Sequence, residues 1–248
     1  MGFFDFLSKN KGDSSARKLS DRDIARLGKV VGEKLAQDYD RQEAIAELGK
    51  CPSAASAAAL LKRFDFQMDP SITDQEEKES AASGIVAAGA EALAPIRDYC
   101  ARAKSLSWPL KVLKQIVEGQ ELTDELLGIL DGFDTEYTRD PQPKIQLLQE
   151  LAEHPSADVR EAVEPFLGDM SEPVRFAAVT TLLAHSVAEV GDALVEALLE
   201  EESLRVKNRI AQGLAEGKFE VPAEQLAAFR EALPPEFRLD GGVPRRAG

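Results

Sequence analysis

One pattern of apolar and polar positions occurs twice in the second half of the chain. PVRFAAVTTLLAH at 173–185 aligns without a gap with RVKNRIAQGLAEG at 205–217, which lies 32 positions further along. Apolar residues coincide at helical spacing in the two segments, whereas the positions between them differ. The coinciding pairs include Val174 and Val206, Ala178 and Ile210, and Leu182 and Leu214. A helical segment that recurs at this distance predicts a stack of two-helix repeats.

The same pattern extends, with looser spacing, over most of the chain. Six aligned helices are predicted to end at Gly49, Gly89, Gly119, His154, His185 and Gly217. Their partner helices are predicted at 53–64, 90–104, 122–131, 157–168 and 188–201. Ser20 is predicted to cap an opening helix whose apolar stripe is Ile24, Leu27, Val31 and Leu35. The four glycines are interpreted as C-terminal helix signals, and 219–233 is predicted to close the stack.

These elements divide the chain into three parts. Residues 1–19 combine an apolar peptide with a polar linker, 20–233 form the helical stack, and 234–248 form a tail. The tail is rich in Pro, Gly and Arg, so we expect it to be disordered. Long alternating runs of β-branched residues are absent, so we expect almost no sheet.

The N-terminal peptide has four large apolar residues within its first seven positions: Phe3, Phe4, Phe6 and Leu7. Two interpretations stay open. The peptide docks in a partner's groove or on a membrane surface, or it folds back on the first repeat or frays.

Composition and charge narrow the class of protein. Hydrophobic residues make up 44% of the chain and aromatic residues only 6%, and the abundant residues are helix formers. The formal net charge is −14, and most of the acidic excess lies between 105 and 217. Nucleic-acid binding needs clustered cations, so it is not expected. The excess also fits a surface that keeps the protein soluble.

Cysteine usage and hydropathy indicate a cytoplasmic protein. Cys51 and Cys100 lie in different helical segments and form no CxxC motif, which is typical of a reducing compartment. No apolar run is long enough to span a membrane, and no signal peptide is recognisable.

Between 158 and 183 the sequence resembles the HEAT-repeat family, including the HEAT-like repeats of phycobilisome lyases and many bacterial scaffold proteins. The matching signature is a polar turn, Val-Arg, paired alanines and a later leucine, as in Val174, Arg175, Ala177, Ala178 and Leu182. The resemblance is good over 140–217, fair over 73–119 and loose over 40–70. It implies an all-α fold, an α-solenoid of stacked antiparallel helix pairs in a right-handed superhelix. It also implies that the second helices line a concave groove, used mainly to hold other proteins.

If the aligned helices line that groove, a helical wheel selects the residues that point away from the stacking core. These residues are predicted to contact a protein partner: Leu110, Leu113, Lys114, Val117, Phe176, Val179, Thr180, Leu183, Asn208 and Gln212. Many are apolar, which fits a strip that receives a partner helix or the burial of a solenoid helix between neighbours. Arg175 and Lys207 align, and they form a short cationic ladder or pair with Glu172 and nearby carboxylates.

Motifs for catalysis, metal binding and cofactor binding are missing from the sequence. The two histidines, His154 and His185, form no His-Glu pair of the kind that a HEAT-type iron hydroxylase needs. Neither cysteine has a histidine in its own or an adjacent unit, and no glycine-rich phosphate loop occurs. An acidic chain with a single tryptophan, Trp108, argues against a HEAT-like DNA glycosylase. We expect no enzymatic activity, no metal and no cofactor.

The sequence therefore favours a non-enzymatic cytoplasmic scaffold or adaptor that binds a protein through the concave face of a HEAT-like solenoid. One alternative, implied by the resemblance alone, is a lyase-like or chaperone-like helper that acts on a client protein or its cofactor. A second alternative is a membrane-surface adaptor that uses the N-terminal peptide.

Overall fold

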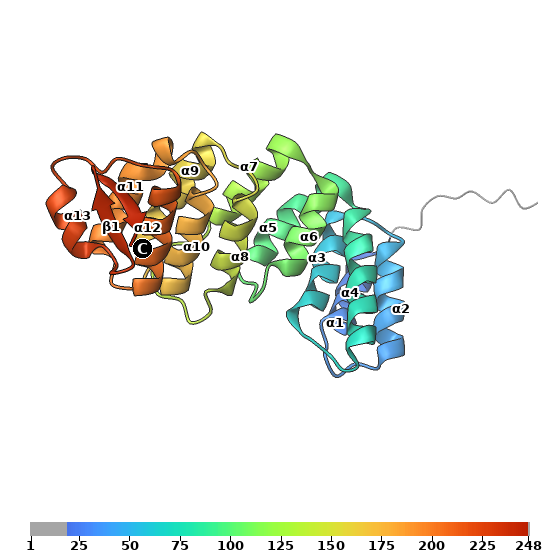
Figure 1. The fold of residues 1–248 in the computed structure, drawn as a ribbon. Helices are drawn as coiled ribbons and strands as arrows, with labels where there is room; N and C mark the ends of the chain where they lie inside the picture. Colours follow the sequence, from blue (N-terminus) through green and yellow to red (C-terminus); the bar gives the residue numbers. More distant parts are fainter. Residues whose placement is uncertain (1–18, 248) are drawn as a thin grey trace, which may run out of the picture. The chain divides into compact units, whose positions relative to one another are not determined.

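The computed structural model describes residues 19–247, which are mainly α-helical and end in a short β-hairpin (Figure 1). The all-α, HEAT-like class predicted from the sequence is confirmed. The described residues divide into two compact units, 19–96 and 97–247, called unit 1 and unit 2. A single solenoid over 20–233 stays a prediction. No helix within residues 19–247 has both the length and the apolar character that crossing a membrane requires.

Unit 1 contains two consecutive helix pairs. Its elements are α1 (Asp21–Val31), α2 (Asp38–Gly49), α3 (Ala54–Leu61), η1 (Lys62–Asp65), α4 (Ser71–Val86) and η2 (Gly89–Ala92). Helix α1 packs on α2 and α3 packs on α4, while α1 also lies beside α3 and α2 beside α4. Leu48, Leu60 and Ile85, from α2, α3 and α4, are fully buried between these helices.

The opening helix begins as predicted and ends earlier than predicted. The backbone N–H of Asp23 donates to Ser20 Oγ at 3.2 Å, and the Ser20 hydroxyl donates to Asp23 Oδ2 at 2.6 Å. Leu27 and Val31 are buried. The prediction for Leu35 is wrong, because α1 ends at Val31 and the Leu35 side chain, in the following turn, is 87% exposed.

Charged side chains form a buried ion cluster in unit 1. Glu77 Oε2 accepts hydrogen bonds from Nε of Arg41 and from Nε of Arg63, each at 2.7 Å. Asp74 forms ion pairs with Arg63 and Lys78, also at 2.7 Å. The side chains of Arg41 and Arg63 are 0% exposed and that of Glu77 is 1% exposed. The cluster joins α2, η1 and α4.

The environment keeps members of the ion cluster charged. Burial raises the pKa of Asp74, but hydrogen bonds from Lys78 and Arg63 more than offset this, so its pKa lies below the usual value. Burial lowers the pKa of Arg41, but hydrogen bonds to carboxylates, Glu77 first, raise it overall. The Phe66 ring covers the cluster, with its centroid 4.5 Å from Cζ of Arg63.

Unit 2 contains the repeats that the sequence showed most clearly. Its elements are α5 (Leu93–Cys100, which begins just before the boundary), α6 (Ser107–Ile116), α7 (Gly119–Leu130), α8 (Gln142–Leu151), α9 (Ala157–Val163), η3 (Glu164–Gly168), α10 (Glu172–Leu182), α11 (Val187–Glu200), α12 (Leu204–Glu216), α13 (Leu226–Ala232), β1 (Phe237–Asp240) and β2 (Val243–Arg246). Figure 1 shows α7, α9 and α11 in one layer and α8, α10 and α12 in the other.

Helices of the second layer approach closely. The Thr181 hydroxyl of α10 donates to the carbonyl oxygen of Leu148 in α8 at 2.7 Å. On the other side of α10, Leu183 packs against Gly213 of α12, where an added Cβ would lie 2.3 Å from Leu183 Cδ2. A larger residue at position 213 would therefore require the Leu183 side chain to move.

Two of the predicted glycine signals are wrong. Helix α6 ends at Ile116 and Gly119, with φ of +59°, begins α7, because Val117 is already extended with φ of −130°. Gly89, with φ of +55°, likewise lies three residues after α4, which ends at Val86, and begins η2. Gly217 caps α12 as predicted, with a right-handed φ of −78°. The helices themselves lie where the repeat pattern predicted them.

The disorder predicted for 234–248 is wrong for the part that forms the β-hairpin. Strands β1 and β2 pair antiparallel, and the residues between them, Gly241 and Gly242, have φ of +58° and +88°. A two-residue hairpin turn of type I′ needs positive φ at both positions, which glycine adopts readily. Phe237 and Pro244 are buried, and β2 packs on α12. The glycines that suggested disorder instead form the turn.

Replacing Glu77 by Gln is expected to lower the free energy of unfolding of unit 1 by about 3–5 kcal/mol. Arg41 and Arg63 would then lose the buried carboxylate that they share and keep only one carboxylate partner each, Asp38 and Asp74. Chemical denaturation followed by circular dichroism measures the change. Glu76→Gln, at an exposed position of the same helix, is the matched control and should change stability by less than about 0.5 kcal/mol. Equal effects of the two substitutions would contradict the role given to Glu77.

Candidate functional site

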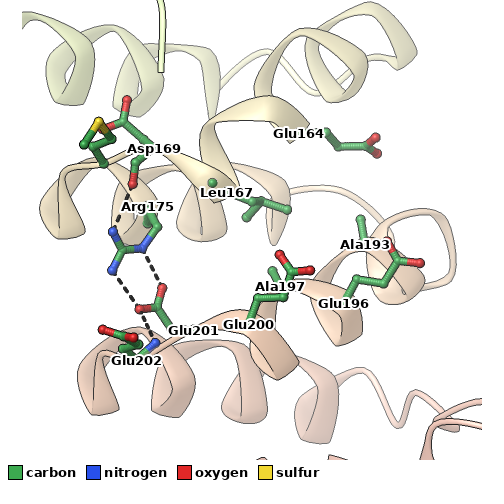
Figure 2. Close-up of a pocket in the computed structure, with 12 residues that line it drawn as sticks. Glu164, Leu167, Asp169, Arg175, Ala193, Glu196, Ala197, Glu200, Glu201 and Glu202 are labelled. Carbon is green, nitrogen blue, oxygen red and sulfur yellow. Dashed lines mark hydrogen bonds and ion pairs between the residues drawn. The ribbon is translucent and has the colours of Figure 1, made fainter. Parts of the chain in front are cut away.

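An open groove in unit 2 lies between η3 and α11 and has a volume of about 560 Å³ (Figure 2). Six lining residues are acidic and one is basic, so we call it the acidic groove. The lining residues are Glu164, Leu167, Gly168, Asp169, Met170, Arg175, Ala193, Glu196, Ala197, Glu200, Glu201 and Glu202. They come from η3, α10, α11 and the loops that precede α10 and α12.

One end of the acidic groove is closed by a fork-like ion pair, drawn with dashed lines in Figure 2. Nε and Nη2 of Arg175 donate to the two carboxylate oxygens of Glu201, each at 2.7 Å. Nη1 of Arg175 donates to the carbonyl oxygen of Asp169 at 2.9 Å. Glu201 Oε1 also accepts from the backbone N–H of Ser203 at 2.7 Å. This pair ties α10 to the loop that precedes it and to the loop between α11 and α12.

The surroundings of Glu201 and Arg175 favour their charged forms. The side chain of Glu201 is 3% exposed. Burial raises the pKa of Glu201, but hydrogen bonds from Arg175 and from the backbone of Ser203 more than offset this and lower it overall. The hydrogen bond to Glu201 raises the pKa of Arg175. The sequence predicted a carboxylate partner for Arg175 as one of two interpretations. The named partner, Glu172, is wrong, because Glu172 pairs with Arg205 at 3.1 Å.

The same arrangement occurs one repeat earlier. Lys144 of α8 pairs with Asp169 at 2.8 Å, and Asp169 Oδ1 accepts from the backbone N–H of Ser171 at 2.7 Å. Asp169 and Ser171 each lie 32 positions before Glu201 and Ser203. In both repeats a cation on the second-layer helix therefore holds a carboxylate that fixes the start of the next second-layer helix. We call these two arrangements the repeated ion pair.

The open side of the acidic groove carries carboxylates that face solvent. Glu196 and Glu200 lie one turn apart on α11, across from Glu164 of η3 (Figure 2). Glu196, Glu200 and Glu202 are exposed and form no ion pair within the described residues. Glu164 has one partner, Arg160, at 3.7 Å. Uncompensated negative charge in a hollow attracts cations from solution.

Apolar atoms lie between these carboxylates. Leu167, Ala193 and Ala197 are half-buried in the walls of the acidic groove, and the Met170 side chain, at its rim, is 61% exposed. An unbranched methionine adapts its shape to different apolar partners. The groove thus combines negative charge with a contact area for apolar side chains.

In residues 19–247, no group of three or more His, Cys, Asp and Glu side chains is arranged to hold a metal ion. The Cys100 thiol is buried, which raises its pKa to about 12 and keeps it protonated. The exposed carboxylates Glu196, Glu200 and Glu202 make the acidic groove suited to binding a cationic ligand.

The structure places the predicted groove residues in two groups. Leu110, Leu113, Val117 and Val179 are at most 6% exposed, so they are core residues, and their prediction as exposed partner contacts is wrong. A solenoid helix sandwiched between neighbours buries more than half its circumference, which explains the error. Phe176, Thr180, Leu183, Asn208 and Gln212 are half-buried and Lys114 is exposed.

The half-buried and exposed members do not form one continuous apolar strip. Leu110 and Lys114 line a hollow of about 400 Å³ between α6 and α8. Asn208 and Gln212 line another of about 620 Å³ between α12 and the β-hairpin. The Phe176 ring is covered by Arg205, whose Cζ lies 3.7 Å from its centroid.

The predicted docking peptide, Phe3, Phe4, Phe6 and Leu7, lies outside the described residues. The acidic groove was not predicted from the sequence. The repeat pattern aligns the second-layer helices, whereas the groove lies between first-layer elements. One signal was available. Glu164 and Glu196 are separated by the repeat length of 32, as are Asp169 and Glu201.

Arg175→Gln is expected to lower the free energy of unfolding at pH 7 by about 1–3 kcal/mol, because the buried Glu201 carboxylate loses its cationic partner. The folded-state pKa of Glu201 lies below its ordinary value of 4.5. Its stabilisation is therefore complete above that pH and is lost as the pH falls through the lowered pKa. The difference between wild type and variant should shrink below about pH 4.

Denaturant titrations at pH 7 and pH 3 measure this difference. Arg205→Gln is the matched control, since the Arg205–Glu172 pair is exposed and is worth at most about 1 kcal/mol. A difference between wild type and Arg175→Gln that is the same at both pH values would refute the pairing.

Comparison with known proteins covers the same part of the chain. Residues 134–215 match the family model of HEAT repeats, and this match includes α8 to α11, all but the last residue of α12, and every residue that lines the acidic groove. No curated protein and no solved structure matches the chain. The match is to HEAT repeats in general and does not distinguish the phycobilisome lyase type. The helix pairs of this segment, joined by the repeated ion pair, are HEAT-like repeats.

Proposed function

We propose that this chain is a non-enzymatic protein-binding scaffold, and that its acidic groove receives a basic, partly apolar segment of a partner protein. HEAT repeats commonly serve as protein-interaction scaffolds. The observation that carries the proposal is the group of unpaired carboxylates, Glu196, Glu200 and Glu202, beside exposed apolar atoms in one groove.

Charge complementarity defines the class of ligand. Lysine or arginine side chains of a partner would pair with Glu196 and Glu200, which are spaced by one helical turn. Because these carboxylates are exposed, such pairs guide association and specificity more than they add affinity. Leucine or methionine side chains of the same segment would cover Met170 and Leu167 and supply the apolar contact.

The frame around the groove supports binding without rearrangement. The repeated ion pair fixes the loops before α10 and α12, and those loops carry Met170 and Glu202. A preorganised surface loses less conformational entropy when a ligand binds. The half-buried Phe176 is a weaker candidate contact, since Arg205 already covers its ring.

The proposal is tested by fluorescence anisotropy with a labelled synthetic peptide. In this peptide, helical turns that carry leucine alternate with helical turns that carry arginine. Glu196→Lys plus Glu200→Lys is expected to weaken binding by about tenfold or more, because attraction becomes repulsion at two sites. Binding to the wild type should also weaken as sodium chloride rises from about 50 to 500 mM, since exposed charges are screened.

A matched variant separates the groove from the general acidity of the chain. Glu121→Lys plus Asp124→Lys changes two exposed carboxylates of α7 and produces the same net charge. It should bind the peptide nearly as well as wild type, and Phe176→Asp should do the same. Equal loss in both charge-reversed variants, or loss only in Phe176→Asp, would remove the groove from consideration.

A further inference from the structure

A second groove, in unit 1, is largely apolar. It lies between α1 and α3 and has a volume of about 310 Å³. Its lining includes small and aliphatic side chains: Ile24, Ala25, Ala55, Ala58 and Ala59. The helices are close enough that a Cβ added to Gly28 would lie 2.9 Å from the Cβ of Ala59. The volume is at the lower end of the range of about 300–1,000 Å³ that is usual for binding pockets.

The two ends of this groove carry opposite charges. Asp21, the first residue of α1, and Lys62, just after α3, both line it. Gly28 lies beside Ala59 and Gly32 beside Lys62, so the two helices run in the same direction. The Asp21 carboxylate therefore marks one end and the Lys62 ammonium the other. Neither forms an ion pair within the described residues.

The chain itself enters at the acidic end of this groove. The described residues begin at Leu19, and Asp21, two positions later, already belongs to the lining. The groove lies between the first helices of the two helix pairs of unit 1, and its alanines at 25, 55 and 58 are exposed. The segment nearest to this surface along the chain is 1–18.

That segment has the composition that the groove fits. Phe3, Phe4, Phe6 and Leu7 supply apolar side chains, Asp5 lies among them, and lysines follow at 9 and 11. Asp5 complements Lys62, and the lysines complement Asp21. The 13 residues between Leu7 and Asp21 can span up to about 43 Å. The groove floor beside α1, from Asp21 to Gly28, is only about 10 Å long.

We propose that the groove between α1 and α3 is the docking site of the chain's own N-terminal segment, with Phe3, Phe4, Phe6 and Leu7 as its apolar anchor. The segment covers the exposed alanines of α1 and α3, which are Ala25, Ala55 and Ala58, and connects to α1 at the end of the groove. This proposal concerns unit 1 and is independent of the acidic groove in unit 2.

Disulfide trapping in the full-length chain tests the proposal. Phe4→Cys and Ala58→Cys are introduced together with Cys51→Ser. Cys100 stays, because its pKa of about 12 leaves almost no reactive thiolate. A disulfide forms only when the two Cα atoms come within about 7 Å. Under mild oxidation, the pair is expected to close within one chain about tenfold faster than a matched pair outside the groove.

The matched pair is Phe4→Cys with Ala46→Cys, which places the second thiol at an exposed position of α2. Equal closure of the two pairs would overturn the proposal. Formation of disulfide-linked dimers alone would overturn it as well, and would assign the groove to a second copy of the chain.

The apolar anchor is tested separately. Adding Phe3→Ser plus Phe6→Ser should slow closure of the groove pair by about tenfold, and an unchanged rate would overturn the anchor role. Sedimentation of the unsubstituted chain with phosphatidylglycerol vesicles gives the last comparison. Co-sedimentation that is lost with the two serines would assign the peptide to a membrane surface and would also overturn the proposal.

Discussion

Unit 2 depends on one kind of interaction. A cation on one helix pairs with a carboxylate in the loop before a later helix. Lys144 with Asp169 and Arg175 with Glu201 repeat this geometry, and in each case the carboxylate also accepts from the backbone two residues on. Apolar stacking alone permits helices to slide, because leucine and alanine surfaces are nearly non-directional. A buried carboxylate with several fixed donors allows one register.

Such pairs contribute specificity of arrangement more than net stability. Removing two charges from water is costly, and the attraction between them offsets that cost only when the geometry is good. Unit 1 solves the same problem with a larger cluster, in which Glu77 serves both Arg41 and Arg63. In unit 2 the pairs leave Glu196, Glu200 and Glu202 free for solvent, and this division between structural and free carboxylates gives the acidic groove its character.

Sequence periodicity predicted the helices well, because apolar spacing and capping residues are local properties. Ser20 illustrates this: its cap depends only on Asp23, three residues away. The ion pairs could not be predicted, since Arg175 had several carboxylates to choose from and its partner lies 26 residues away. The hairpin was not predicted, because a composition rich in glycine suggests disorder. Gly241 and Gly242 are recognisable as a turn only once the flanking strands are seen to pair and β2 to pack on α12. Four of the ten predicted contact residues were wrong for a related reason. Leu113 and Val179, for example, are covered by neighbours that a single-helix wheel omits.

A double-mutant cycle on Lys144 and Asp169 tests the central role of the repeated ion pair most directly. The free energy of unfolding is measured for wild type, Lys144→Met, Asp169→Asn and the double variant. The account predicts a coupling energy of about 1–3 kcal/mol, because each single substitution leaves its buried partner uncompensated. The same cycle on Lys114 and Glu150, where the lysine side chain is 45% exposed, should give less than about 1 kcal/mol. Additive effects of the two substitutions at 144 and 169 would contradict the account.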